Sequence, residues 1–303
     1  MRVLRNISFW LAVILCTASC STIRRALTVC KDKPDVTAEE FTKIISPDGI
    51  LEDITYRCSI DGPSSRRAIV YLPEEYRSDT LKRFSVLYLI HGARGNETSW
   101  ITEGDIIHCI DSLRRNGLAG QFILVLPNMN QYDDDADFGN SRFKKMTESY
   151  FETNGAVESA FMRDVVKYVD SLYRTMPDKK HRAIAGLSIG AMQAMYISAA
   201  NPDSFGAIGL FSPTPKCPIH KSPYSDFYSG LKGKQKLQFA DAPEHYNIYI
   251  GHHDIYIQSV DSYKIYLSVN KFPFKYTETA GGHGWNSWKD FSERFIKVIF
   301  PVR

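Results

Sequence analysis

One serine stands in a pattern that suits it to nucleophilic attack. Ser188 is the centre of Gly-Leu-Ser-Ile-Gly at 186–190, after a short predicted strand at 181–185 and before a helical run at 191–200. A sharp turn from a buried strand into a helix holds such a serine in a strained conformation that exposes its hydroxyl. The flanking glycines lack the side chains that would collide there. The pattern predicts a nucleophile elbow, and a plain glycine turn is the alternative.

A serine hydroxyl needs a base to take its proton, and the base needs an acid to orient it. Asp254 follows an apolar run at 246–250, and His283 follows the next such run in a glycine-rich loop. Serine, acid and histidine in this order, each after a strand, can meet at one edge of a sheet. Asp261 and Glu278 are weaker candidates for the acid, because the first lies in a helical run and the second within a strand.

Backbone amides are needed to stabilise the oxyanion that forms when a serine attacks a carbonyl. The N–H of Ile189, directly after the serine, is one candidate donor, and that of Ala93, in the loop after a buried run at 84–90, is the other. His252 and His253 beside Asp254 raise a metal site as an alternative. Adjacent histidines in a short loop rarely face one ion, so we predict no metal and no cofactor.

Apolar runs and helical spacings predict the elements that position these residues. Alternating runs at 51–59 and 67–72 favour two antiparallel edge strands. Further strands are predicted at 84–90, 122–126, 181–185, 207–211, 246–250 and 274–279, and helices at 156–173, 191–200, 260–270 and 285–300. The buried side of 156–173 is expected to comprise Phe161, Val165, Val166, Val169 and Leu172. The alternation indicates an α/β fold with a mostly parallel sheet between helices, and 212–243 is expected to cover the site as an irregular insertion.

The first twenty residues differ in composition from the rest of the chain. A basic start precedes an apolar run that is shorter than a membrane span, and small residues then lead to Cys20. This predicts an export signal, with a lipidated Cys20 favoured over ordinary cleavage. The predicted organisation is a signal segment over 1–20, a polar tether over 21–48 and one α/β domain over 49–303. We expect a periplasmic or outer-membrane-anchored lipoprotein, or else a secreted protein.

Composition limits the partners. The 303 residues carry a net charge of +3 and are 44% hydrophobic, which suits a folded domain and offers no support for nucleic-acid binding. The only membrane contact expected is through a lipid anchor. An exported chain can form disulfides, and Cys30–Cys58 is the pair to test first; unpaired thiols, including Cys109 and Cys217, are the alternative.

These motifs together resemble the putative esterase family. The matching segments are Leu-Ile-His-Gly at 89–92, the block 178–190, Gly-x-x-Asp ending at Asp254, and Gly-His-x-Trp over 282–285. That family of α/β-hydrolases includes esterase D, feruloyl esterases of carbohydrate esterase family 1, siderophore esterases and mycolyltransferases. The resemblance implies Ser188 as nucleophile, His283 as base and Asp254 as orienting acid, without metal or cofactor. Ala191, where many members have glycine, departs from the pattern.

Export and this resemblance together imply a secreted serine esterase that removes feruloyl or acetyl groups from xylan. Trp100, Tyr132 and Trp285 are candidate walls for an aromatic or sugar-bearing substrate, with core packing as the alternative. Siderophore ester cleavage and acyl transfer are the other enzymatic possibilities. A carbohydrate-binding module on a hydrolase fold that has lost its activity is the non-enzymatic one.

Overall fold

A single twisted sheet positions the predicted site residues. The computed structural model describes residues 37–45, 47–60, 65–130, 153–215, 219 and 221–302. Its strands are β1 (Ile50–Arg57), β2 (Ser65–Leu72), β3 (Ser85–Ile90), β4 (Phe122–Pro127), β5 (Arg182–Leu187), β6 (Ala207–Phe211), β7 (His245–Gly251) and β8 (Lys275–Thr279). They lie in the order β1-β2-β4-β3-β5-β6-β7-β8. β1–β2 and β2–β4 pair antiparallel, and every later pair is parallel, as the sequence predicts for an α/β-hydrolase fold.

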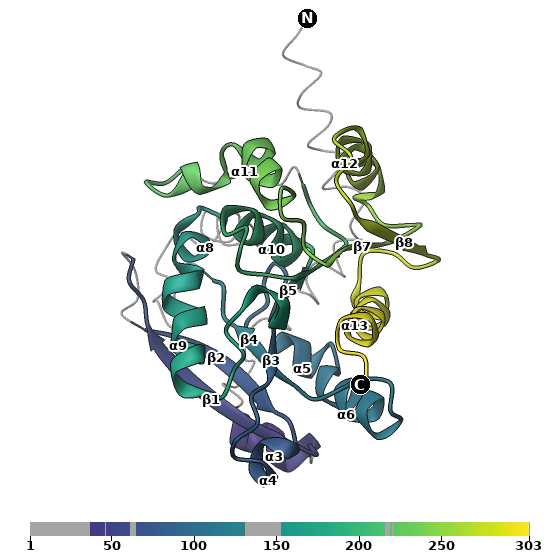
Figure 1. Ribbon diagram of the computed structural model, residues 1–303. Coiled ribbons are helices and arrows are strands. Elements are labelled where there is room, and N and C mark those ends of the chain that lie inside the picture. Colours follow the sequence, from purple (N-terminus) through teal and green to yellow (C-terminus); the bar gives the residue numbers. More distant parts are fainter. Residues whose placement is uncertain are drawn as a thin grey trace, which may run out of the picture. The chain divides into compact units, whose positions relative to one another are not determined.

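Helices cover both faces of this sheet. They are α3 (Ala38–Ile45), α4 (Glu75–Ser78), α5 (Ser99–Thr102), α6 (Ile106–Arg115), α8 (Ala156–Phe161), α9 (Lys167–Leu172), α10 (Ile189–Ala200), α11 (Leu231–Gln238), α12 (Ile257–Val269) and α13 (Trp285–Ile299). Figure 1 shows α8, α9 and α10 on one side of the sheet and α6 and α13 on the other. β4, β5 and β6 are therefore buried along their whole length, which explains why their sequences are apolar apart from Arg182 at the start of β5.

The predicted helix over 156–173 is interrupted. A π-helical turn, Met162–Val166, separates α8 from α9. Such a turn contains an extra residue and shifts the helical phase of the residues after it. The prediction that Leu172 is buried is therefore wrong: its side chain is 49% exposed, whereas Val169 and Tyr173 are buried.

The sequence analysis did not predict α3, α4, α5, α6 or α11. The stretch 212–243 is not wholly irregular, because it contains a short 3₁₀ helix, Ser225–Tyr228, and α11, which packs on α10. Helix α3 lies within the segment 21–48 and packs against β1, where the backbone N–H of Ala38 donates to Asp53 at 2.7 Å. Helix α11 is short and mostly polar, which gives little periodic signal in sequence. Helix α3 is amphipathic, with Ala38 and Phe41 buried, so its periodic pattern was present and was overlooked.

A buried carboxyl on α8 makes the stability of this fold sensitive to pH. Glu158 is 1% exposed and accepts a hydrogen bond of 2.7 Å from the side-chain amide of Gln193 on α10. Burial raises its pKa, although hydrogen bonds from Gln193, Tyr228 and the backbone oppose that effect. The folded protein thus holds this proton more tightly than the unfolded chain does. The stability that Glu158 contributes is fully present below the pKa that its carboxyl has in the unfolded chain. It is lost as the pH rises through the higher pKa of the same carboxyl in the folded protein.

Replacing Glu158 by glutamine is expected to raise Tm at pH 8 by about 2 °C or more, because folding then requires neither the uptake of a proton nor the burial of a carboxylate charge. Toward pH 4 the gain should shrink, since the carboxyl is then largely protonated in both states. Calorimetry at the two pH values measures the difference. Glu103→Gln, at an exposed position after α5, is the matched control and should show no such pH dependence. An equal gain at both pH values would contradict this account.

Candidate active site

The turn between β5 and α10 has the geometry of a nucleophile elbow. Ser188 adopts φ 55° and ψ −117°, a conformation that non-glycine residues rarely occupy. A Cβ on Gly186 would lie 2.5 Å from the backbone of Gly190, and one on Gly190 would lie 2.1 Å from the carbonyl oxygen of His91. Only glycine fits at either position. The backbone N–H of Ser188 donates to the carbonyl of Phe211 at 2.8 Å, which ties the turn to β6.

The structure brings Ser188, His283 and Asp254 together at the carboxyl edge of the sheet. Nε2 of His283 lies 3.0 Å from Oγ of Ser188. Its Nδ1 lies 3.1 Å and 3.0 Å from the two carboxylate oxygens of Asp254. Nδ1–H therefore donates to the carboxylate, which leaves Nε2 free to accept the serine proton. These side chains follow β5, β8 and β7, strands that are widely separated along the chain.

The carboxylate of Asp254 is held in its ionised form. Burial by itself would raise the pKa of Asp254, but hydrogen bonds from His283, from the Ser212 hydroxyl and from the N–H of Tyr256 outweigh that effect and lower it. The bond from Tyr256 N–H measures 2.9 Å. An aspartate that stays charged at neutral and mildly acidic pH can orient the imidazole and stabilise its protonated form.

The alternative acids are engaged elsewhere. Asp261 lies on α12, is exposed and binds Lys264 at 3.0 Å. Glu278 accepts hydrogen bonds of 2.6 Å from Nδ1 of His252 and from the Tyr276 hydroxyl. His252 is therefore turned toward β8, whereas its near neighbour Asp254 is turned toward His283, so the two do not converge on one point. Within the described ranges, no group of three or more histidine, cysteine or carboxylate side chains could hold a metal ion.

Two aromatic rings that the sequence analysis missed enclose the imidazole of His283. The Tyr256 ring lies 5.0 Å from it at 66°, and the Trp288 ring lies 5.1 Å away at 88°. Both present an edge-to-face contact, the geometry that aromatic pairs prefer. Their spacing could have indicated this: Tyr256 is two residues after Asp254, and Trp288 is one helical turn after Trp285, which follows the histidine loop.

A buried histidine shapes the loop after β3. The backbone N–H of Met129 donates to Nε2 of His91 at 3.0 Å, so the proton of this ring must sit on Nδ1, which donates to the carbonyl of Gly92 at 2.8 Å. Burial lowers the pKa of His91 to about 4, despite the opposing bond to Gly92. The ring is thus neutral at neutral pH, and it ties the loop after β3 to the chain that follows β4.

The predicted oxyanion donors are the N–H of Ile189, at the elbow, and the N–H of Ala93, in the loop after β3. The contact of His91 with Gly190 brings the loop against the first turn of α10. Neither the N–H of Ile189 nor that of Ala93 donates a hydrogen bond to another described residue. The N–H of Ile189 lies at the N-terminus of α10, which favours a developing negative charge, and the N–H of Ala93 is a loop donor.

The three residues predicted to line the substrate site differ in where the structure places them. Trp100 is not a wall, because it is 1% exposed and belongs to the core, where its Nε1–H donates to the carbonyl of Ile90 at 3.1 Å. Its bulk supports the end of β3 instead. Trp285 is partly exposed and packs edge to face on Trp100 and Trp288, at 5.2 Å and 5.3 Å. Tyr132 lies outside the described residues.

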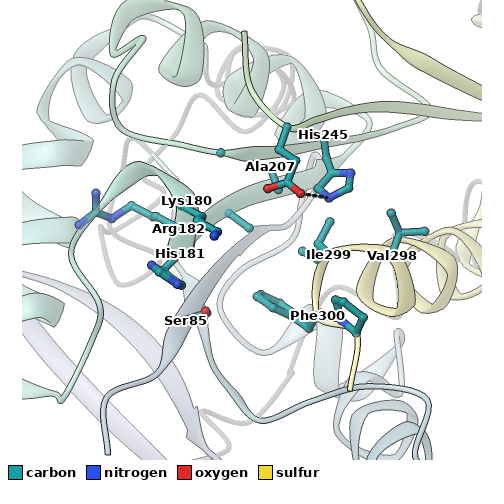
Figure 2. Close-up of a pocket in the computed structure, with 13 residues that line it drawn as sticks. Ser85, Lys180, His181, Arg182, Ala207, His245, Val298, Ile299 and Phe300 are labelled. Atoms are coloured by element: carbon teal, nitrogen blue, oxygen red, sulfur yellow. Dashed lines mark ion pairs between the residues drawn. The ribbon is translucent and has the colours of Figure 1, made fainter. Parts of the chain in front are cut away.

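A cavity of about 190 Å³ lies at the opposite edge of the sheet (Figure 2). Its lining includes residues at the start of four parallel strands, namely Ser85, Arg182, Ala207 and His245. Nε2 of His245 lies 3.8 Å from a carboxylate oxygen of Glu244, another residue of the lining. Ser188, Asp254 and His283 instead follow the carboxyl ends of strands, where α/β sheets bind ligands. The cavity is therefore separate from the candidate site.

The remaining predictions concern cysteines and the membrane. Cys58 is a buried free thiol, and burial raises the pKa of the free thiol of Cys109 to about 12, which makes it a poor nucleophile. The free thiol of Cys58 contradicts the predicted Cys30–Cys58 disulfide and agrees with the alternative of unpaired thiols. Cys20, Cys30 and Cys217 lie outside the described residues. Among the helices of the described ranges, none has both the length and the apolar character needed to cross a bilayer.

Comparison with known proteins identifies the family to which this chain belongs. Residues 62–298 match the family described as "Putative esterase". An endo-1,4-beta-xylanase/feruloyl esterase of Xylanibacter ruminicola is 32% identical over 167 residues, which are 54% of this chain and 22% of that protein. The chain thus spans about a fifth of the length of that curated relative.

Solved structures share the fold. A ferulic acid esterase superposes with a TM-score of 0.68 at 20% identity, over 84% of this chain and 99% of the other. A ferulic acid esterase of carbohydrate esterase family 1 from Anaeromyces mucronatus gives 0.63 at 23% identity, over 82% and 90%. Identities this low show a common fold. The family match over most of the chain goes further: this protein belongs to the putative esterase family of α/β-hydrolases.

Proposed function

We propose that this protein is a serine carboxylic-ester hydrolase in which Ser188 is the nucleophile. Nε2 of His283 takes the hydroxyl proton as Oγ attacks the ester carbonyl, and Asp254 holds the imidazole in the required tautomer. The amides of Ile189 and Ala93 stabilise the oxyanion. The observation that supports this most directly is the bridge that His283 forms, 3.0 Å from Ser188 on one side and 3.0 Å from Asp254 on the other.

The reaction proceeds through an acyl-enzyme. Protonated His283 gives its proton to the leaving alcohol as the tetrahedral intermediate collapses, and the acyl group remains on Oγ of Ser188. Water then attacks the acyl carbonyl while His283 removes its proton. Collapse of the second intermediate releases the carboxylic acid and restores the serine. No step requires a cofactor.

We propose ester decorations of plant polysaccharide, feruloyl or acetyl groups on xylan, as the substrate class. The support is the similarity to a protein named as an endo-1,4-beta-xylanase/feruloyl esterase, and to ferulic acid esterase structures of which one is in complex with ferulic acid. Trp285 is a partly exposed ring near the site, as is Tyr256, and could stack on a feruloyl group or a sugar.

Labelling with a fluorophosphonate tests the proposal. One equivalent should attach, and peptide mapping should locate it on Ser188. Hydrolysis of p-nitrophenyl acetate, methyl ferulate and acetylated xylan then ranks the substrates. Inertness toward both the label and every ester would overturn the proposal and favour a carbohydrate-binding role. Preference for a competing alcohol over water would indicate acyl transfer, and turnover of cyclic siderophore esters alone would replace the polysaccharide substrate.

We also propose that the chain is exported and anchored by a lipid on Cys20. The support is the composition of residues 1–20, in which a basic start and an apolar run precede Thr-Ala-Ser-Cys. In a bacterial host that processes lipoproteins, the wild-type protein should sediment with membranes, and Cys20→Ser should move it out of that fraction. Equal fractionation of the two would exclude the anchor.

A further inference from the structure

Ser212 occupies a central place in the sheet edge that carries the candidate site. It follows β6, the strand that lies between β5 and β7. The carbonyl of Phe211 accepts the N–H of Ser188 at 2.8 Å, and the N–H of Ser212 donates to the carbonyl of Tyr249 on β7, also at 2.8 Å. The Phe211–Ser212 segment is thus bonded on one side to the nucleophile and on the other to the strand that leads to Asp254.

Three features set Ser212 apart from an ordinary loop serine. It is 0% exposed, and its φ of 50° lies in the left-handed region that a serine seldom adopts. Its Oγ accepts a hydrogen bond of 3.1 Å from Nε1–H of Trp288. A buried side chain in a strained conformation persists only where its surroundings hold it there, and such positions cluster at functional sites.

The partners of this hydroxyl are themselves parts of the site. Trp288 donates to Ser212 and also packs edge to face on the imidazole of His283. With the tryptophan donating to Oγ, the hydroxyl proton is left to point at an acceptor, and Asp254 is the carboxylate with which it interacts. A chain of contacts therefore runs from Trp288 through Ser212 to the carboxylate, and from the same tryptophan to the base.

We propose that Ser212, held by Trp288, is a positioning residue that fixes the carboxylate of Asp254 opposite Nδ1 of His283. The inference rests on the proposed hydrolase function. A carboxylate that receives donors from three directions cannot rotate away from the imidazole. Ser212 acts through Asp254 and need not touch the substrate, so its loss should affect kcat rather than KM.

Removal of the hydroxyl should also change the pH profile. Without that donor the carboxylate is more basic and attracts the imidazolium more strongly, so the base stays protonated to higher pH. The acid limb of kcat/KM is therefore expected to move to higher pH. A residue with a merely structural role would reduce the amount of folded enzyme and leave the limb in place.

Paired variants separate the hydroxyl from the backbone. Ser212→Ala and Ser212→Gly both remove the hydroxyl, and glycine in addition accepts the positive φ without strain. Both should lower kcat for p-nitrophenyl acetate about 10- to 100-fold, the range expected for a hydrogen bond to a charged group. Ser198→Ala is the matched control, because that serine is equally buried on α10 but donates to the carbonyl of Met195 at 3.1 Å. It should keep wild-type kcat.

The tests distinguish failure of this inference from failure of the proposed function. An active wild type, with both Ser212 variants at wild-type kcat and an unmoved acid limb, would overturn the positioning role. If the wild type hydrolyses no ester, the proposed function fails instead. The downfield ¹H NMR signal of the His283 Nδ1 proton is then the readout: a changed shift in Ser212→Ala, absent in Ser198→Ala, supports the inference, and an unchanged shift refutes it.

Discussion

Replacing Ser188 by alanine is expected to lower kcat for p-nitrophenyl acetate by about 10⁴- to 10⁶-fold, the loss typical when a nucleophile is removed from a serine triad. Without Oγ there is no atom to accept the acyl group, so the covalent step is lost rather than slowed. Any remaining turnover comes from the oxyanion donors and from binding. Steady-state kinetics with stoichiometric fluorophosphonate labelling measures the effect, and the label should fail to attach to the variant.

This variant should remain folded. Alanine takes the same backbone conformation at φ 55° as serine does, and the turn is still tied to β6 through the N–H of residue 188. Circular dichroism and Tm should therefore match the wild type within about 2 °C, a change that corresponds to less than about 1 kcal/mol. Activity within tenfold of wild type in a folded Ser188→Ala protein would mean that another residue is the nucleophile.

Replacing Asp254 by asparagine is expected to have the second largest effect, a fall in kcat of about 10⁴-fold with the fold retained. The amide has nearly the shape of the carboxylate, and its oxygen can still accept the N–H of Tyr256. Its NH₂ group, however, donates toward the imidazole and selects the tautomer in which Nε2 carries the proton. That nitrogen then cannot take the proton of Ser188.

Asp261→Asn is the matched control for this prediction. Asp261 is also near the acid loop and was the second sequence candidate, but it is exposed and bound to Lys264. Its variant should retain wild-type kcat. Loss of activity in Asp261→Asn with a fully active Asp254→Asn would reverse the assignment of the acid.

Local sequence pattern was sufficient to predict the elbow and the positions of the strands along the chain. The glycines that flank Ser188 are required because a larger side chain would collide with the backbone packed at the turn, and the motif of five residues reveals this. The apolar sequences of β4, β5 and β6 result directly from burial on both faces of the sheet. Asp254 and His283 could be named because each directly follows a predicted strand. These features need no knowledge of distant contacts.

Features that depend on packing between distant segments were missed. The burial of Trp100 results from its place under the end of β3, beside Phe211 and Trp285, and a tryptophan in the core has the same local sequence as one at the surface. The exposure of Leu172 depends on a π-helical turn that periodicity does not reveal. Helix α11 is short and mostly polar and gives little periodic signal. Helix α6 is amphipathic, with Ile106, Ile107, Ile110 and Leu113 buried, and its periodic pattern was overlooked.

By itself the sequence determined the fold class, the elbow at Ser188 and the two strand ends that hold the other candidate residues, because strand burial and tight turns depend on neighbours along the chain. Only the tertiary structure decided which carboxylate faces the imidazole, which rings enclose it and that the Ser212 hydroxyl interacts with Asp254. Within the triad, His283 contacts residues that are 29 positions (Asp254) and 95 positions (Ser188) away in sequence. They form only when β5 to β8 are aligned side by side, and no local pattern specifies that alignment.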